Sequence, residues 1–257
     1  MAPLLAWAER AADSPSAGRS TTSGQDEPME LIDALRSTGA VRAFTPEAVD
    51  ASTLWRVLDT ARFAPSGGNG QGWHVVVVQD PAARAGIRDL YLPGWYDYLA
   101  MSMAGLRPWA PTNDIAAEAA ALPGAAAIRD RAAANPSFAE RLDEVPVLLA
   151  VFADLSVLAA VDRDAARYSF CGGASVYPFT WNLLLAARAE GLGGVVTTMC
   201  IKREAEVKEL LGAPDDHALA AVIALGHPVK QLTKLTRAPV ESFATIDRFD
   251  GRPLTSH

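Results

Sequence analysis

The stretch Ala64-Pro-Ser-Gly-Gly-Asn-Gly-Gln-Gly-Trp-His-Val-Val-Val-Val78 joins a glycine-rich loop to a run of valines. Its glycines at 68, 70 and 72 come close to the fingerprint of dinucleotide-binding loops, in which a strand precedes the glycines and a helix follows them. The order here is reversed, because residues with helical apolar spacing precede the glycines: Leu54, Val57, Leu58 and Ala61. The pyrophosphate of a dinucleotide binds at the N-terminus of the helix after the loop, so the sequence argues against a nucleotide held in the Rossmann manner.

Side-chain amides and hydroxyls alternate with the glycines of this loop at Ser66, Asn69 and Gln71. Such a loop suits contacts with a flat ring that forms hydrogen bonds. Taken alone, it is more typical of an ordinary turn from a helix to a strand.

Composition narrows the possible functions. The chain has 257 residues, half of them hydrophobic, and a net charge of -7, so it offers no basic face for nucleic acid. Two cysteines, Cys171 and Cys200, show neither metal-ligand spacing nor a disulfide framework, which favours a reducing cytoplasm and no metal site. We expect a cytoplasmic protein that binds no nucleic acid.

The first 28 residues are small, polar and rich in Pro, Gly and Ser, and we predict a disordered leader before a single domain over 29–257. Leu4 to Ala8 is too short for a signal-peptide core, and no later run reaches the roughly 20 apolar residues that a membrane span needs. We therefore expect no membrane partner. Met29 opens a helical pattern and is an alternative start of the protein.

The apolar spacing predicts that helices and strands alternate, with helices in excess. Residues 164–190 read as a long helix kinked at Pro178, and its apolar second half places it at the centre of the fold. Residues 93–143 read as a helical excursion, either a lid or an ordinary packing subdomain. We expect the other helices at about 29–37, 51–63, 80–90 and 204–211, and strands at about 73–79, 145–153, 195–201 and 218–225.

Four segments in this order resemble the FMN-dependent nitroreductase family over about Met29 to Phe243. They are Val41–Thr45, Ala61–Trp73, Ala187–Gly193, and Leu225–Pro228 followed by Arg237-x-Pro239. The resemblance implies an α+β fold, with a mixed, mostly antiparallel sheet surrounded by helices. It also implies a homodimer that binds FMN between its subunits, and passage of electrons from NAD(P)H through the flavin to a nitroaromatic, quinone or similar small-molecule acceptor.

The resemblance assigns the glycine-rich loop to the flavin ring. It places Arg42 beside the pyrimidine side of that ring, where a cation stabilises the negative charge left by reduction. Asn69 falls at the amide position that pairs with the N3/O4 edge, because an amide offers a donor and an acceptor in one plane. The same match adds further loop residues to the cofactor site: Ser66, Gly67, Gly68 and Gln71.

The second half of the implied site lies near the C-terminus. Val196, Thr197 and Thr198 match the segment that runs past flavin N5 and O4. Arg237 matches a phosphate-binding arginine, and Lys234 is a weaker candidate. The basic residues here also suit a solvated tail.

The sequence departs from the family at two places. Thr38-Gly39-Ala40 replaces the usual Arg-Arg-Ser or Arg-His-Ser, so one phosphate contact is missing or moved. Gly72 replaces a more usual proline.

No Ser/His/Asp or paired-carboxylate constellation is apparent, so we predict no catalytic acid or base. Our leading prediction is an FMN-dependent NAD(P)H oxidoreductase. The alternatives are a specialised desaturase or dehalogenase, with acceptor choice set in 93–143, or a flavin storage protein without turnover. We expect the apolar helix at 176–187 to be buried between the two subunits.

Overall fold

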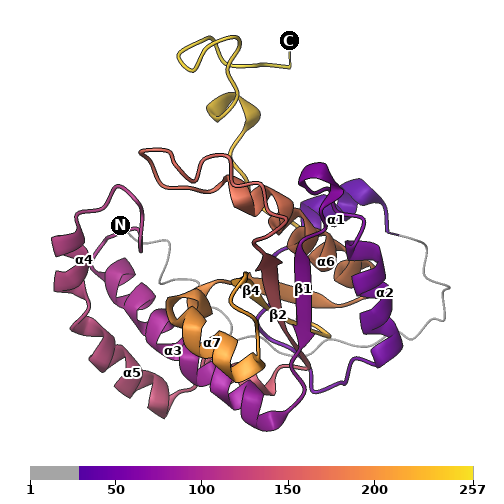
Figure 1. Ribbon diagram of the computed structural model, residues 1–257, viewed down its shortest axis with the longest axis vertical. Coiled ribbons are helices and arrows are strands. Elements are labelled where there is room, and N and C mark those ends of the chain that lie inside the picture. The colour runs from indigo at the N-terminus through magenta and orange to yellow at the C-terminus, as the bar shows by residue number, and fades with distance from the viewer. Residues whose placement is uncertain (1–28, 257) are drawn as a thin grey trace.

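The computed structural model describes residues 29–256, so the predicted leader lies outside the described residues. Its helices and strands are shown in Figure 1. The helices are α1 (Leu31–Ser37), α2 (Ala51–Ala61), α3 (Pro81–Met103), α4 (Ile115–Ala121), α5 (Gly124–Ala134), α6 (Tyr177–Ala189) and α7 (Glu204–Leu211). The strands are β1 (Trp73–Val77), β2 (Val147–Asp154), β3 (Gly193–Thr197) and β4 (His217–Gly226).

The four strands form one sheet in the order β1-β2-β4-β3, and every neighbouring pair is antiparallel. An isolated parallel bridge joins Ala40 to Gly194 beside β3. The predicted α+β fold with a mixed, mostly antiparallel sheet surrounded by helices is confirmed.

Both faces of the sheet are covered, as the alternation of β2 shows. Leu149 and Val151 pack in a core with α2 and α6, whereas Leu148 and Ala150 pack in a second core with α3 and α7. Figure 1 shows α2 and α6 on one side of the sheet, and α3, α5 and α7 on the other. This double burial explains why β2 is apolar along its whole length.

Helix α3 begins where the sequence predicted. The Asp80 carboxylate accepts a hydrogen bond of 2.8 Å from the backbone N–H of Ala83, and Pro81 follows at the first helical position. The predicted end near residue 90 was wrong, because α3 continues through Pro93 to Met103. Buried side chains on both sides of the proline, Tyr91 and Tyr96 among them, hold the helix against its neighbours.

The predicted helix at 164–190 was wrong in its first half, because α6 begins only at Tyr177. Pro178 lies in the first turn, where its missing N–H costs no helical hydrogen bond, so it starts the helix and does not kink it. Residues 155–170 contain no helix, and the Asp162 carboxylate organises their end. Gly191, with φ of 75°, follows the end of the helix, and β3 begins at Gly193.

The apolar face of α6 is buried within its own chain. Phe179, Leu183 and Ala187 pack in the core shared with α2 and the sheet. Two large side chains of α6, Tyr177 and Trp181, are exposed. The hydrophobicity of this helix therefore does not by itself require a partner subunit, and the predicted burial at 176–187 between subunits stays a prediction.

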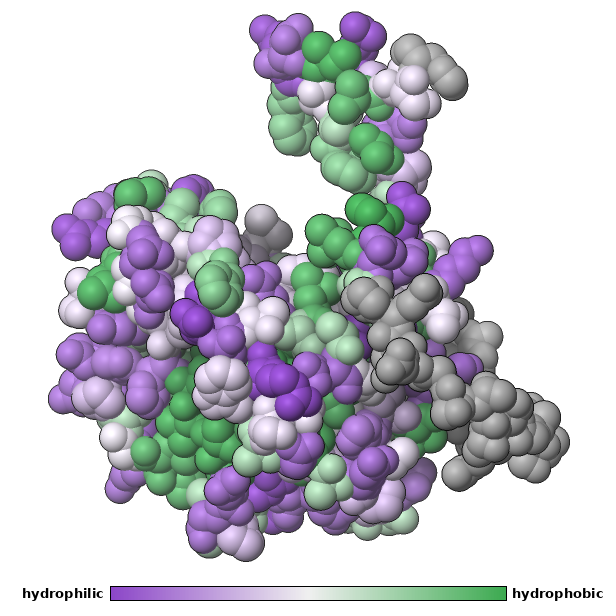
Figure 2. All heavy atoms as spheres, turned by 90° about the vertical axis from the view of Figure 1, so that its right-hand side faces the viewer, coloured by the Kyte–Doolittle hydropathy of each residue, from purple (hydrophilic) through white to green (hydrophobic). Residues whose placement is uncertain are grey.

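The C-terminal residues from Val240 onward stand away from the rest of the molecule in two views (Figures 1 and 2). This arm has a turn of its own, closed by a bridge between Thr245 and Pro253. Phe243 and Phe249 are exposed on it, and Figure 2 shows hydrophobic and hydrophilic residues mixed over the arm. Among residues 29–256, no helix combines the length and hydropathy needed to span a membrane.

Candidate functional site

Arg42 lies in an extended segment held between β3 and the residues that follow β4. The backbone N–H of Val41 donates to the carbonyl oxygen of Gly194 over 2.9 Å, and the N–H of Val229 donates to the carbonyl of Ala43 over 3.0 Å. Gly193 permits this arrangement, because a Cβ there would lie 2.7 Å from the Val41 side chain. The backbone on both sides of Arg42 is thereby fixed.

The Arg42 side chain is half-buried, and this burial lowers the pKa of its guanidinium. Two tyrosines of α3, Tyr91 and Tyr98, interact with it electrostatically. Burial raises the pKa of Tyr91 to about 12, whereas its hydrogen bond with Thr197 acts in the opposite direction. Arg42, Tyr91 and Thr197 therefore form one cluster, which we call the arginine cluster.

Two further predicted residues adjoin Thr197. Val196 pairs with Ile223 in the sheet and is half-buried, and Thr198 is exposed just after β3. Beyond Tyr91, aromatic rings continue along α3: the Tyr91 and Trp95 centroids are 6.2 Å apart, and those of Trp95 and Tyr98 are 5.5 Å apart. The arginine cluster is therefore bounded on one side by aromatic rings.

The segment that contains Lys234 and Arg237 passes close to Gly39. Gly39 belongs to the stretch 38–40, where the sequence departs from the family pattern. A Cβ on Gly39 would lie 2.6 Å from a methyl of Leu232 and 2.9 Å from one of Leu235. Lys234, between these leucines, is exposed. Arg237 is also exposed, and its Nη1 donates to the carbonyl of Thr236 over 2.8 Å.

Thr38, beside this crossing, is buried, and its hydroxyl has no hydrogen-bond partner in the described part of the chain. A buried hydroxyl without a partner is costly in a folded protein and is commonly satisfied by a ligand or water. The Thr38 hydroxyl, together with the cations Lys234 and Arg237, suits the binding of an anionic group.

The glycine-rich loop forms a second cluster with a strained backbone. Gly68, Asn69 and Gln71 all adopt the left-handed conformation, with φ of 59°, 55° and 49°. The Ser66 hydroxyl accepts a hydrogen bond of 2.9 Å from the backbone N–H of Gln71. Left-handed residues other than glycine are uncommon and concentrate at functional sites.

Close packing explains the glycine at position 72, and a hydrogen bond holds Gly67. A Cβ on Gly72 would lie 2.6 Å from Cγ2 of Val157, so this position requires glycine while Val157 holds its conformation. Gly67 donates its N–H to the Ser175 hydroxyl over 3.0 Å. These contacts hold the loop against the segment 155–175.

Trp73 packs against the core. Its ring stacks on Phe179 of α6 at 4.9 Å.

The glycine-rich loop and the segment that carries Arg42 lie at opposite ends of the sheet within one chain. The glycine-rich loop adjoins the end of β2, where the Asp154 N–H donates to the Gly72 carbonyl, and Asp154 pairs with His217 at the start of β4. Gly194, which holds the Arg42 segment, pairs with Leu225 near the end of β4. Leu225 lies eight residue steps along the strand from His217, roughly 26 Å, and Val222, which pairs with Thr197 of the arginine cluster, lies five steps away, roughly 16 Å. One chain does not bring the two predicted halves of the site together.

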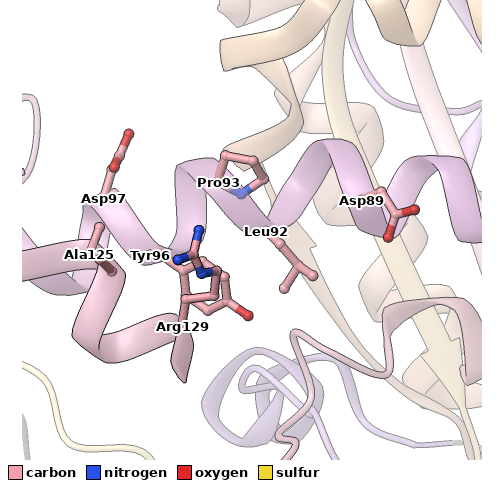
Figure 3. Close-up of a pocket in the computed structure, with 8 residues that line it drawn as sticks. Asp89, Leu92, Pro93, Tyr96, Asp97, Ala125 and Arg129 are labelled. Atoms are coloured by element: carbon pink, nitrogen blue, oxygen red, sulfur yellow. The ribbon is translucent and has the colours of Figure 1, made fainter. Parts of the chain in front are cut away.

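A cavity of about 390 Å³ lies between α3 and α5, and it is shown in Figure 3. Tyr96 from α3 and Arg129 from α5 line it, together with Asp89 and Asp97. It contains none of the predicted flavin residues, although most of its lining lies in the excursion 93–143 that the sequence suggested for acceptor choice. Within the described chain, no group of three or more His, Cys, Asp or Glu side chains is arranged to hold a metal ion.

Comparison with known proteins decides the family. The sequence pattern of the nitroreductase family matches residues 35–227, three quarters of the chain. The chain belongs to the nitroreductase family. Members of this family are generally flavin-dependent oxidoreductases, so the coarse part of the function predicted from the sequence is confirmed.

Three relatives show the range of chemistry in this family. A 5,6-dimethylbenzimidazole synthase from Rhodobacter capsulatus is 32% identical over 209 residues, covering 77% of this chain and 83% of that one. An NADH dehydrogenase from Thermus thermophilus is 27% identical over 202 residues, covering 79% and 88%. The structure of an iodotyrosine deiodinase bound to FMN and 3-iodo-L-tyrosine has a TM-score of 0.57 and 25% identity, covering 86% of this chain and 100% of that one.

Sequence reasoning missed two residues that organise these clusters. Tyr91 lies in a helix outside the family motifs, and Asp162 lies just before the segment 164–190 that was predicted as helix. The aromatic spacing of Tyr91, Trp95 and Tyr98 on one face of α3 is a signal that could have identified the first. Nothing in the sequence around Asp162 distinguishes it from the other acidic residues nearby.

Proposed function

We propose that this nitroreductase-family protein is an FMN-dependent oxidoreductase that takes electrons from NAD(P)H and delivers them to a quinone, nitroaromatic or similar acceptor. The observation that carries the proposal is the separation of the two clusters, one cationic and one neutral, each suited to a different part of a flavin. The similarity to a deiodinase bound to FMN and to an NADH dehydrogenase supports it.

The residues present fit FMN. In the proposed assignment, Arg42 faces the pyrimidine side, Arg237 and Lys234 face the phosphate, and Thr38 donates its unpartnered hydroxyl. This last contact would compensate for the family arginine and serine that the sequence lacks at 38–40. No adenine-binding fingerprint was found in the sequence, which favours FMN over FAD.

Two chains are needed to complete this site. Since the segment that carries Arg42 and the glycine-rich loop lie at opposite ends of one sheet, a single flavin contacts both only if a second copy supplies one of them. A two-fold axis then creates two equivalent sites, because each chain gives the same residues to the other. The exposed Phe243 and Phe249 on the C-terminal arm are further surface that a partner subunit would cover.

FMN, when bound, supplies the hydride-accepting and electron-donating chemistry. The chain's own groups bind and tune it. The half-buried guanidinium of Arg42 favours negative charge beside it, and Tyr91 and Tyr98 limit the positions that it can adopt. The proposal assigns no side chain as catalytic acid or base.

Specialised chemistry is the second candidate. The 32% identity to a 5,6-dimethylbenzimidazole synthase and the structural similarity to a deiodinase favour it, because both are named for reactions other than nitro reduction. The two candidates share the flavin site and differ in the acceptor.

The first test is the visible absorbance of the purified protein, followed by mass analysis of the ligand released on denaturation. We expect a flavin spectrum, FMN, and NADH or NADPH oxidation that depends on added quinone. Failure to bind FMN after reconstitution would overturn the proposal. FMN binding without turnover on quinones, nitroaromatics or iodotyrosine would favour a storage protein.

A further inference from the structure

Four aromatic rings, which we call the aromatic row, follow one another without a gap beside α3. Tyr91, Trp95 and Tyr98 share one face of α3 because they are spaced by four and three residues, and Trp109 follows in the loop before α4. The centroid distances along the row are 6.2 Å, 5.5 Å and 6.3 Å. Neighbouring rings of the row are therefore in contact.

The composition of the row is as particular as its length. Within residues 29–256, each of the other ring contacts joins a single pair, such as Trp73 with Phe179. Every ring of the row belongs to a tyrosine or a tryptophan, the aromatic side chains that lose one electron most readily. Phenylalanine does not share this property. The row is therefore a continuous series of oxidisable groups.

The inner end of the row lies against the arginine cluster. Tyr91 is buried in a core that also contains Val195 of β3, and Trp95 packs against the same core. The Tyr91 hydroxyl is hydrogen-bonded with Thr197, two residues beyond Val195 in that strand. Since Thr197 and Arg42 are assigned to the flavin, the row begins one side chain away from its proposed position.

The outer end of the row reaches the surface. Trp109 is half-buried, and the Nζ of the exposed Lys202 lies 5.1 Å from the centroid of its ring. Trp95 and Tyr98, between the two ends, are also half-buried. The row thus extends from a buried tyrosine to an indole that solvent can reach.

Charges along the row decide where a missing electron rests. The Arg42 guanidinium interacts electrostatically with Tyr91 and Tyr98, and a cation beside a ring opposes the positive charge that loss of an electron leaves there. The tyrosines therefore pass electrons on, whereas Trp95 holds the vacancy. At Trp109, release of the indole proton to water removes the positive charge that Lys202 opposes.

We propose that the aromatic row carries one-electron oxidising equivalents from the flavin to the surface, so that a thiol in solution reduces light-excited flavin through the row. The inference rests on the proposed function, because that function places the flavin beside Arg42 and Thr197. Electron transfer slows exponentially with distance, so several short steps between touching rings are faster than one long step. The row removes oxidising equivalents before they damage other side chains around the flavin.

Electrons and protons balance over the cycle. Trp95 gives one electron, through Tyr91, to the light-excited flavin, and Trp109 then gives one electron, through Tyr98, to Trp95. The Trp109 indole releases its proton to water, and a thiol returns one electron and one proton to it. Two such cycles join two thiols in one disulfide and deliver two electrons to the flavin.

Replacing the inner tryptophan tests the path. Trp95→Phe keeps a ring but not an oxidisable one, and Trp73→Phe makes the same change beside the glycine-rich loop, outside the row. The oxygen-free, FMN-loaded protein is excited by a laser flash, and the tryptophan radical is followed by its absorbance. The rate of flavin reduction by dithiothreitol in blue light and the dissociation constant of FMN are measured on the same samples.

We expect a long-lived tryptophan radical in the unaltered protein and in Trp73→Phe, and its loss in Trp95→Phe. Trp109→Phe should shorten the lifetime of the radical, because the vacancy then stays at Trp95, close to the flavin. Light-driven reduction by dithiothreitol should slow in Trp95→Phe and Trp109→Phe, and the dissociation constant of FMN should be unchanged in all variants.

Three results would overturn the inference: no tryptophan radical in the unaltered protein, an unchanged radical in Trp95→Phe, or an equal loss in Trp73→Phe. Absence of FMN binding by the unaltered protein would refute the proposed function, and this inference with it. The two failures are distinguishable, because the first three results are obtained with FMN bound.

A change outside the row tests its outer end. Lys202→Gln removes the cation above Trp109 and should raise the yield of the radical, since less work is needed to place positive charge on the ring. Lys202 is exposed, so the change should leave FMN binding intact. A yield that is unchanged or lower would show that the vacancy does not reach Trp109.

Discussion

The arginine cluster and the glycine-rich loop differ in charge, in burial and in backbone conformation. The first withdraws a guanidinium from water and surrounds it with tyrosines of α3. The second exposes a neutral backbone with three residues in the left-handed region, fastened to the segment 155–175. We propose that one region stabilises charge and that the other receives a flat, uncharged surface. Because they are separated along the sheet, neither region alone forms the complete flavin site that we propose.

The largest expected effect concerns the glycine beneath Arg42. Gly194→Ala would place a Cβ 2.7 Å from the carbonyl oxygen of Ala224, a backbone atom that cannot turn aside. We expect the free energy of unfolding to fall by about 3 kcal/mol, at the upper end of overpacking. Urea unfolding of the variant and the unaltered protein measures it, and a loss below about 1 kcal/mol would show that β3 adjusts freely.

A pair of arginine variants distinguishes tuning of the flavin from anchoring it. Arg237→Ala should weaken FMN binding by roughly 1.5 to 3 kcal/mol and barely move the reduction potential, because a phosphate contact is equal in both redox states. Arg42→Ala should lower the potential more than it weakens binding, since its interaction strengthens as negative charge develops. Dissociation constants and midpoint potentials measure both. Equal effects on the two quantities would mean that these arginines are wrongly assigned.

A smaller effect is expected for the glycine of the other region. Gly72→Ala brings a Cβ against Val157, but the Val157 side chain is exposed and free to turn, so we expect a loss of about 1 kcal/mol. The double variant Gly72→Ala with Val157→Ala should recover most of it. If the double variant is as unstable as the single one, Val157 is not the residue that requires glycine here.

The sequence predicted the architecture well and the local geometry less well. The helix before the loop, the strand after it and the antiparallel sheet follow from apolar spacing and from the family motifs, which depend on local residue order. The failure at 164–176 has a specific cause: Ala165 and Ala166 favour a helix, but the hydrogen bonds to Asp162 hold the chain in another path.

The sequence predicted which residues belong to the site, but it did not predict how they are arranged in space. Arg42, Thr197 and the loop were named from motif order, which does not report where they lie along the sheet. Tyr91 was missed because its role depends on the packing of α3 against β3, a contact between segments about 100 residues apart. Tertiary contacts of this kind leave no local pattern in one sequence.

A mixed dimer tests the central claim, that one flavin needs residues from two chains. Arg42→Glu disables the arginine cluster, and Gly67→Glu places a charge in the glycine-rich loop. The two variants, with different affinity tags, are unfolded together, refolded with FMN and purified through both tags, and the ratio of bound FMN to protein is measured.

We expect each variant alone to retain almost no FMN, and the mixed dimer to bind about one FMN per two chains, because one of its two symmetric sites combines both intact regions. A mixed dimer that binds no FMN, although the unaltered protein refolded in the same way binds it fully, would contradict the account.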